Sequence, residues 1–399
     1  MTYRFPMLWQ PPTKSTVFWM HITIALKWIL ILYKNMCCHP LNIKLEGNFI
    51  LMKKRQYSLD FLKVCATIFV LFHHYQQYIS GSFESGINFY GGIYNFGYMV
   101  ELFFILSGYF MYPYIEKIRQ GISFKDYYLS RYIRLIPLVA IAAFVYQFLV
   151  LVHIRTVGAA WFMHSSNLWE TIVAALGFQE GWVFRNNIYV NYPVWYVSVL
   201  LLCYLIFYFT TFLSKKFHIS GRYFYLSFVF IGIAINSYGW HFPFLNEYTA
   251  RGYCAFFTGV LLATYCFERN TTKRETIVSL VIIALILVLI IFHNNLVANG
   301  MHYISTFILF PAIIMVFKTP IVSKLLSHKI YQTAAQIAFN SFIWQMPLLV
   351  ALLIFINNVQ SGVNFISREC MWIFLFIAII TGTLSHFLIE KQFNKIISK

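Results

Sequence analysis

Residues 277–292 read IVSLVIIALILVLIIF, with Lys273 and Arg274 before them and His293 after them. A helix of about 20 apolar residues crosses the hydrocarbon core of a bilayer, so this stretch predicts a transmembrane helix. The same pattern recurs along the chain. Ten such segments are predicted, at about 58–78, 94–113, 134–154, 194–213, 222–239, 253–267, 275–293, 303–318, 336–356 and 370–389. The sequence therefore predicts an all-α, polytopic integral membrane protein with about ten transmembrane helices in one bundle.

The composition supports the membrane class. Of the 399 residues, 60% are hydrophobic and only 11% are charged, whereas a soluble domain carries about 25% charged residues. The formal net charge of +17 would suggest a nucleic-acid partner in a soluble protein, but no basic face or nucleic-acid motif is present here. We expect the lipid bilayer, and no nucleic acid, among the partners.

The distribution of Lys and Arg predicts the orientation of the bundle. Alternate loops hold twenty Lys and Arg residues, and the loops between them hold only Arg155, Arg185, Arg251 and Arg368. An excess of basic residues marks the cytoplasmic loops of membrane proteins. This alternation predicts that both ends of the ten-helix core, residues 52–399, lie in the cytoplasm.

Residues 1–51 are an uncertain N-terminal extension. The segment 16–33 is apolar enough to span a membrane, but Lys27 interrupts it and no small-residue cleavage pattern of a signal peptide follows. Met52 directly precedes the basic run at 53–55, which is typical of the cytoplasmic start of a first helix. Two interpretations stay open, an eleventh helix or upstream sequence included by an early start codon, and the second is favoured.

The first core segment carries several ionisable residues at membrane depth. It reads SLDFLKVCATIFVLFHH over residues 58–74. Lys63 and His74 are eleven residues apart, close to three helical turns, which places them on one face about 16 Å apart. A cation suits a phosphate, and an imidazole suits proton transfer near neutral pH. Alternatively, Asp60 and Lys63 form an ion pair, and the two histidines, His73 and His74, cap the outer helix end.

Further candidates follow in the next two segments. Glu101 is predicted near the outer leaflet, where it pairs with a histidine or lines a polar cavity, and Ser107 with Gly108 favours close helix packing. Arg131 and Arg134 are three residues apart at a predicted cytoplasmic helix start, where they clamp phosphates or anchor the helix. The seven cysteines form no C-x-x-C pair, so we expect no metal site.

These residues occur in segments that together resemble the membrane-bound acyltransferase 3 family, which includes bacterial polysaccharide O-acetyltransferases. The resemblance covers 52–399. It rests first on a basic residue followed by ten residues and a His, met by Lys63 and His74. Four further segments match family motifs in order: Glu101–Tyr109, Arg131–Pro137, Pro193–Ser198 and Arg251–Gly259.

The chain departs from the family pattern at a few positions. Lys63 stands where Arg is frequent, and Lys lacks the bidentate fork of a guanidinium. Gln345 stands where many members have His, Leu200 where some have Glu, and Gln392 where Pro is common. These differences indicate a divergent subgroup and leave the acceptor harder to predict.

The resemblance implies an enzyme of the bacterial cytoplasmic membrane that transfers an acyl group, acetyl above all, from cytoplasmic acyl-CoA to a hydroxyl of an extracytoplasmic carbohydrate such as a cell-surface polysaccharide. No bound cofactor is implied. Lys63, Arg131 and Arg134 would hold the CoA phosphates, and His74 with Glu101 would be catalytic, His74 as a general base or as a transient acyl-histidine. The other motif residues would serve the acceptor or the structure: His73, Ser107, Trp195, Tyr196, Ser198, Arg251 and Gln345.

Two other function classes compete with this interpretation. A transporter of a lipid-linked sugar or an acylated small molecule would also carry intramembrane charges, but the sequence shows no inverted repeat. A noncatalytic membrane sensor is less favoured because no cytoplasmic signalling domain is evident. Incorporation of labelled acetyl groups into a product distinguishes the enzyme from both.

Overall fold

The computed structural model describes residues 55–79, 88–92, 94–158, 167–182, 190–292, 295–359 and 364–393. The uncertain N-terminal extension, 1–51, lies outside these ranges. Within them the chain is helical and contains no β-strand. The α-helices are α2 (Tyr57–Ile79), α3 (Met99–Tyr109), α4 (Tyr112–Arg119), α5 (Phe124–Val157), α6 (Leu168–Ala175), α7 (Trp195–Lys216), α8 (Gly221–Tyr238), α9 (Glu247–Cys266), α10 (Lys273–Phe292), α11 (Asn295–Ile304), α12 (Phe310–Phe317), α13 (Pro320–Leu325), α14 (Ile330–Val359) and α15 (Arg368–Ser385). Short 3₁₀ turns, η1 (Phe96–Tyr98) and η2 (Tyr192–Val194), lead into α3 and α7, and π-helical segments, η3 (Ser305–Leu309) and η4 (His386–Glu390), continue α11 and α15.

The all-α membrane class predicted from the sequence is confirmed. Each of the ten predicted apolar segments overlaps helix in the described residues. Six stretches of the described residues are long and apolar enough to cross a membrane, and the number ten remains a prediction. These six are Phe124–Val157, Tyr192–Lys216, Lys273–Phe292, Gly300–Phe317, Ile330–Ile356 and Arg368–Phe393.

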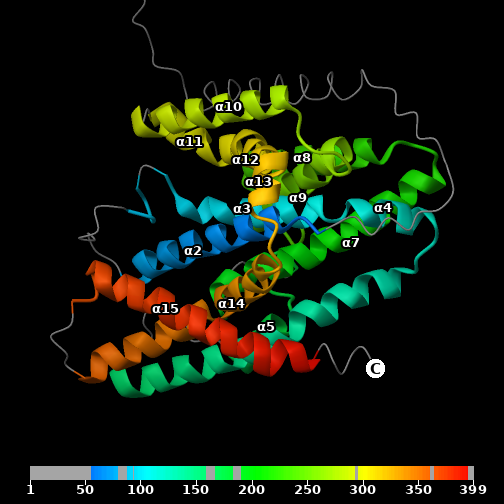
Figure 1. Ribbon diagram of the computed structural model, residues 1–399. Helices are drawn as coiled ribbons and strands as arrows, with labels where there is room; N and C mark the ends of the chain where they lie inside the picture. The colour runs from blue at the N-terminus through cyan, green and yellow to red at the C-terminus, as the bar shows by residue number, and fades with distance from the viewer. Residues whose placement is uncertain are drawn as a thin grey trace, which may run out of the picture.

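The helices α2 and α3 run through the middle of the bundle (Figure 1). On one side α3 packs against α9, which in turn packs against α8, and α10 to α13 lie beyond. On the other side α2 packs against α14, which also contacts α5 and α15. Polar side chains of α2 and α3 are therefore surrounded by protein on two sides.

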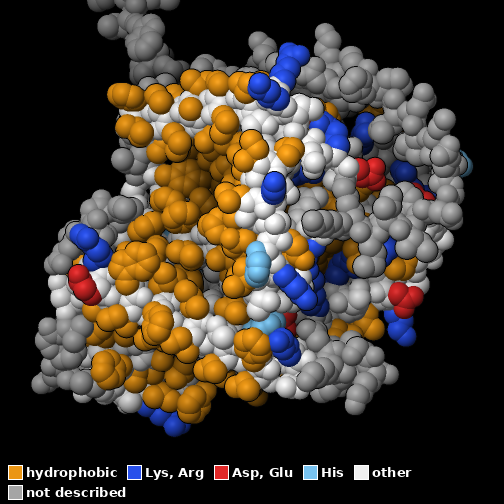
Figure 2. All heavy atoms as spheres, in the orientation of Figure 1, with side chains coloured by type: hydrophobic (Ala, Val, Ile, Leu, Met, Phe, Trp, Pro, Cys, Tyr) orange, Lys and Arg blue, Asp and Glu red, His pale blue; other side chains and the backbone are white. Residues whose placement is uncertain are grey.

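The outer helices present apolar side chains away from the core. Only 11% of the apolar stretch of α10 is buried in the protein, against 72% for the stretch that contains α7. Figure 2 shows hydrophobic side chains over much of one face, and several Lys and Arg side chains gather on the right of the view. Because an apolar face of this extent is stable in lipid and not in water, it is a surface for the bilayer.

Two helices begin earlier than the sequence predicts. The side chain of Ser123 caps α5, so the helix starts at Phe124 and includes Arg131 and Arg134, which were predicted at its start. The prediction that Arg251 lies in an external loop is wrong. Asn246 caps α9 from before Glu247, which places Arg251 in the second turn of a helix, with its side chain partly buried.

Two glycines let α3 and α9 approach each other closely. A Cβ atom on Gly108 would lie 2.0 Å from the carbonyl oxygen of Phe256, and one on Gly259 would lie 2.0 Å from that of Ile105. Neither position has room for a methyl group. Small residues at a helix contact allow this approach in membranes, where van der Waals packing holds helices together.

Replacing Gly259 by Ala will force α3 and α9 apart and lower the free energy of unfolding by about 1–3 kcal/mol, the usual cost of overpacking. Thermal unfolding of the purified protein in detergent measures the change. The matched control is Gly221→Ala, since the atoms nearest to a Cβ there belong to the Tyr225 side chain, at 3.2 Å or more, and not to backbone. Equal melting temperatures for the two variants would show that the close contact does not stabilise the bundle.

Candidate functional site

The helix α2 carries the basic residue and the histidine that the sequence singles out, on one uninterrupted helix. Near its start, the buried carboxylate of Asp60 accepts hydrogen bonds from Arg55 at 2.7 Å and from Lys63 at 3.2 Å. The Lys63 ammonium also lies 4.4 Å from the centre of the Phe110 ring and stays partly exposed. The predicted pair of Asp60 and Lys63 is present, and a second cation shares that carboxylate.

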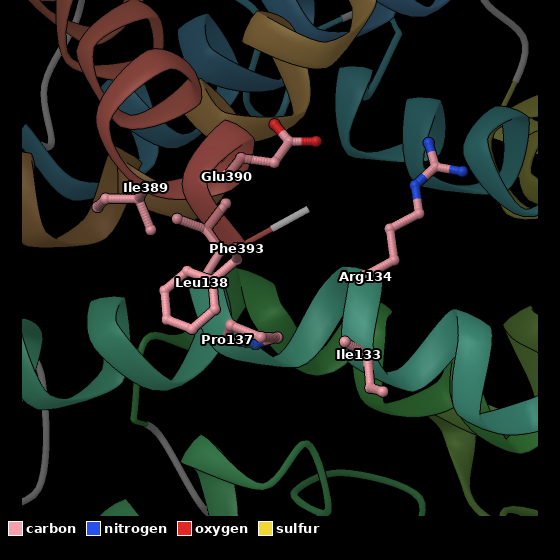
Figure 3. Close-up of a pocket in the computed structure, with 7 residues that line it drawn as sticks. All are labelled: Ile133, Arg134, Pro137, Leu138, Ile389, Glu390 and Phe393. Carbon is pink, nitrogen blue, oxygen red and sulfur yellow. The ribbon is translucent and has the colours of Figure 1, made fainter. Parts of the chain in front are cut away.

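A small open pocket lies between α5 and η4 (Figure 3). Arg134 and Glu390 project into the same space from these two elements, and Arg134 is exposed. Arg134 is also close enough to Lys63 for electrostatic interaction. Within the described residues Arg134 makes no hydrogen bond or ion pair, so its guanidinium can bind an anion.

Arg131, one turn before Arg134, is in a different environment. Its guanidinium carbon lies 4.0 Å from the centre of the Tyr114 ring and 3.7 Å from that of Tyr127, and one NH group donates to the Tyr127 carbonyl. The side chain is buried. Cation–π contacts and this hydrogen bond hold the charge inside the protein, so Arg131 and Arg134 do not form one open clamp.

The two histidines near the other end of α2 are buried and adjacent. His74 Nδ1 lies 2.8 Å from Oε1 of Gln345 on α14. His73 Nδ1 lies 3.0 Å from the Phe89 carbonyl oxygen, and the centres of the two imidazole rings are 5.1 Å apart. The structure therefore brings together His73, His74 and Gln345, three of the predicted site residues.

Glu101 contacts a different set of residues. Its carboxylate is fully buried and accepts two hydrogen bonds from Arg251, at 2.6 Å and 3.0 Å, with His302 Nε2 3.0 Å away. Arg251 also donates to the Gly97 carbonyl at 3.1 Å. The predicted pairing of Glu101 with a histidine is present, but the partner is His302 and not a histidine of α2.

The remaining predicted site residues lie between α3, α7 and α9. The Ser107 and Tyr196 hydroxyls are 3.1 Å apart. The Arg251 guanidinium carbon lies 4.8 Å from the centre of the Trp195 ring. Ser198 donates to the Glu180 carbonyl at 2.9 Å, which ties α7 to the segment before it. Trp195 thus adjoins the Glu101–Arg251 ion pair, and the Ser198 hydrogen bond supports the backbone.

The family model described as an acyltransferase domain, acyltransferase 3, matches residues 56–391. The chain belongs to the acyltransferase 3 family. No curated protein and no solved structure gives a significant match. Membership supports a membrane-bound acyltransferase, and the match covers every candidate residue described above.

Two polar residues of this acyltransferase 3 chain were missed at the sequence level. His302 lies directly before the predicted segment 303–318. A histidine at the edge of a predicted span was the signal that could have pointed to it. Glu390 accepts from Asn340 at 2.7 Å and lies 2.7 Å from His386 Nδ1, within the pocket that Arg134 enters. The features that distinguish Glu390, its hydrogen bond with Asn340 on α14 and the pocket that it lines with Arg134, join segments far apart in the chain. No group of His, Cys, Asp and Glu suited to a metal ion is found in the described ranges.

Replacing Arg251 by Gln will lower the free energy of unfolding by about 3–5 kcal/mol, because it leaves the buried Glu101 carboxylate without its cationic partner. The double variant Glu101→Gln/Arg251→Gln removes both charges and will recover part of that loss. Thermal unfolding in detergent compares the two.

The matched control is Arg269→Gln. Arg269 also pairs with a glutamate at 2.6 Å, but Arg269 and Glu275 are partly exposed, so the expected loss is about 1 kcal/mol or less. A double variant no more stable than Arg251→Gln would contradict the assignment of the loss to an uncompensated charge.

Proposed function

We propose that the protein transfers an acetyl group from acetyl-CoA at the cytoplasmic face of a bacterial inner membrane to a hydroxyl of a carbohydrate on the other side. Family membership supports the reaction class. The observation that carries the proposal is α2 itself, one helix with a partly exposed cation toward one end and a buried histidine toward the other. The basic loops predict that the Lys63 end is cytoplasmic.

The donor phosphates would bind at Lys63 on α2 and Arg134 on α5. The Lys63 ammonium is partly exposed, and Arg134 lines the open pocket between α5 and η4. Guanidinium and ammonium groups form strong charge-assisted hydrogen bonds to phosphate. We assign Arg131 a supporting place, since its guanidinium packs against Tyr114 and Tyr127. The uncharged pantetheine arm would then run along α2 toward His74.

His74 would act as the general base. Its imidazole takes the proton from the acceptor hydroxyl as the oxygen attacks the thioester carbonyl carbon. The carbon–sulfur bond then breaks, and the CoA thiolate leaves and takes up the proton. The products are an ester and free CoA, and a base placed in this way typically contributes about 10²–10⁴ in rate.

The acceptor would enter from the opposite end of α2, where the histidines are surrounded by tyrosines. The ring of Tyr90 is centred 5.2 Å from that of His73, and the ring of Tyr78 is 6.1 Å from that of His74. Aromatic faces suit the apolar faces of sugar rings. This surrounding supports a carbohydrate acceptor.

We infer a positioning role for Glu101. Its carboxylate holds Arg251 and His302, and Arg251 in turn reaches the Gly97 carbonyl, next to His73. A Cβ on Gly97 would lie 3.0 Å from the His73 ring, so this backbone forms one wall of the histidine pair. Glu101 would thus position the Gly97 backbone beside His73 through Arg251, and would not contact the reacting atoms.

The variant His74→Ala will reduce transfer of labelled acetyl from acetyl-CoA to extracted surface polysaccharide by at least about 100-fold, since it removes the base. His73→Ala will cause a smaller loss. The matched control is His241→Ala, an exposed histidine outside the bundle core. Unchanged incorporation in a normally expressed His74→Ala variant would refute the catalytic assignment, and polysaccharide export without any acetyl incorporation by the native protein would favour a transporter.

The variant Lys63→Ala will raise the KM for acetyl-CoA about 10- to 100-fold through loss of one charge-assisted hydrogen bond, with a smaller change in kcat. Asp60 keeps its ion pair with Arg55, so no buried carboxylate is left alone. Lys63→Arg will retain most of the donor affinity, and the exposed Lys216→Ala is the control. An unchanged KM for Lys63→Ala would remove this residue from the donor site.

A further inference from the structure

The side-chain amide of Gln345 is fully buried, and both of its ends are occupied. Its Nε2 lies 2.8 Å from the Phe342 carbonyl oxygen, one turn earlier in α14. A carbonyl oxygen only accepts hydrogen bonds, so the atom facing it must be the NH₂ group. The amide orientation is therefore determined by the protein, and Oε1 faces α2.

This orientation determines which nitrogen of His74 carries the proton. Oε1 of Gln345 lies 2.8 Å from His74 Nδ1. An amide oxygen cannot donate, so Nδ1 must be the N–H group of the neutral imidazole. The lone pair is then on Nε2, which makes no hydrogen bond within the described part of the chain.

We propose that Gln345 is a positioning residue that holds His74 in the Nδ1–H tautomer, so that Nε2 is the atom that removes the proton from the acceptor hydroxyl. The inference rests on the proposed function. The other tautomer would place an N–H group toward the acceptor and a lone pair against the amide oxygen. Both contacts would then be unfavourable, and the imidazole could not act as a base in that direction.

A side chain from another segment bonds to the backbone of α14 near Gln345. Pro347 lies two residues further along α14 and has no N–H, so it cannot bond to the carbonyl four residues earlier, that of Ile343. Asn191 Nδ2 donates to this free carbonyl at 3.0 Å. Asn191 has a left-handed backbone, φ 51°, directly before η2. The break in the hydrogen bonding of α14 thus anchors the segment that leads into α7 beside Gln345.

Two substitutions separate the positioning role from a packing role. Gln345→Leu and Gln345→Glu both lose the NH₂ group that donates to Phe342, but only Glu keeps an oxygen for His74 Nδ1–H. We expect Gln345→Leu to lower kcat about 10- to 100-fold, the range for a partner that orients a functional imidazole, with the KM for acetyl-CoA within about twofold of the native value. Gln345→Glu will recover most of kcat.

The measurement is steady-state transfer of labelled acetyl by detergent-purified protein, with the amount of monodisperse protein determined for each variant. Equal kcat for the Leu and Glu variants, or a native kcat for Leu, would overturn the inference. Activity of His74→Ala decides the proposed function separately. If His74→Ala is inactive while Gln345→Leu is fully active, only the role of Gln345 is refuted; if His74→Ala is active, the general-base mechanism fails as a whole.

Should Gln345→Leu not yield folded protein, Gln345→His provides the second test. A neutral imidazole there presents a ring nitrogen that can accept the Nδ1–H of His74. Recovery of kcat with this variant supports the acceptor role, and an inactive but folded His variant with an active Glu variant would restrict the role to an oxygen acceptor. Inactivity of both folded variants would contradict the proposal.

Discussion

A polar or charged side chain inside a membrane bundle must find its partners within the protein, because the hydrocarbon offers none. Several contacts in the interior of this bundle follow that constraint. The Glu101 carboxylate is fully buried and bonded to Arg251, with His302 beside it. Asp60 is shared by two cations, and the Gln345 amide has both ends occupied. These contacts join α2, α3, α9 and α14 and thereby position the residues near His74.

Composition and periodicity predicted the class of the protein because lipid imposes a simple rule on the outer surface. The helices α10 and α15 present mostly apolar side chains, so long stretches of their sequences are apolar. The relation between Lys63 and His74 was likewise predictable, since both lie on one continuous helix and only helical geometry is involved. Membership in the acyltransferase 3 family, inferred from five short segments, is confirmed over 56–391.

Contacts between segments far apart in the chain could not be predicted from the sequence. Gln345 lies 271 positions after His74, and Arg251 lies 150 positions after Glu101. Their pairing depends on how α14 and α9 pack, which no local pattern encodes. Arg131 and Arg134 illustrate the same limit at short range. Both fit a phosphate-binding motif, but Tyr114 from α4 covers the first and leaves the second open to the pocket.

The length of α5 affects how much hydration free energy the ionised groups of a bound acyl donor would lose. Its 34 residues extend about 51 Å, well beyond the roughly 30 Å of the hydrocarbon core. Arg134 lies about 15 Å from the start of this helix, so the portion of α5 before it can stand in the interfacial zone. A ligand held by Arg134 keeps its ionised groups at a depth where water and lipid headgroups still solvate them. Only the neutral part of such a molecule has to pass into the low-dielectric interior, where an ion would lose its hydration free energy.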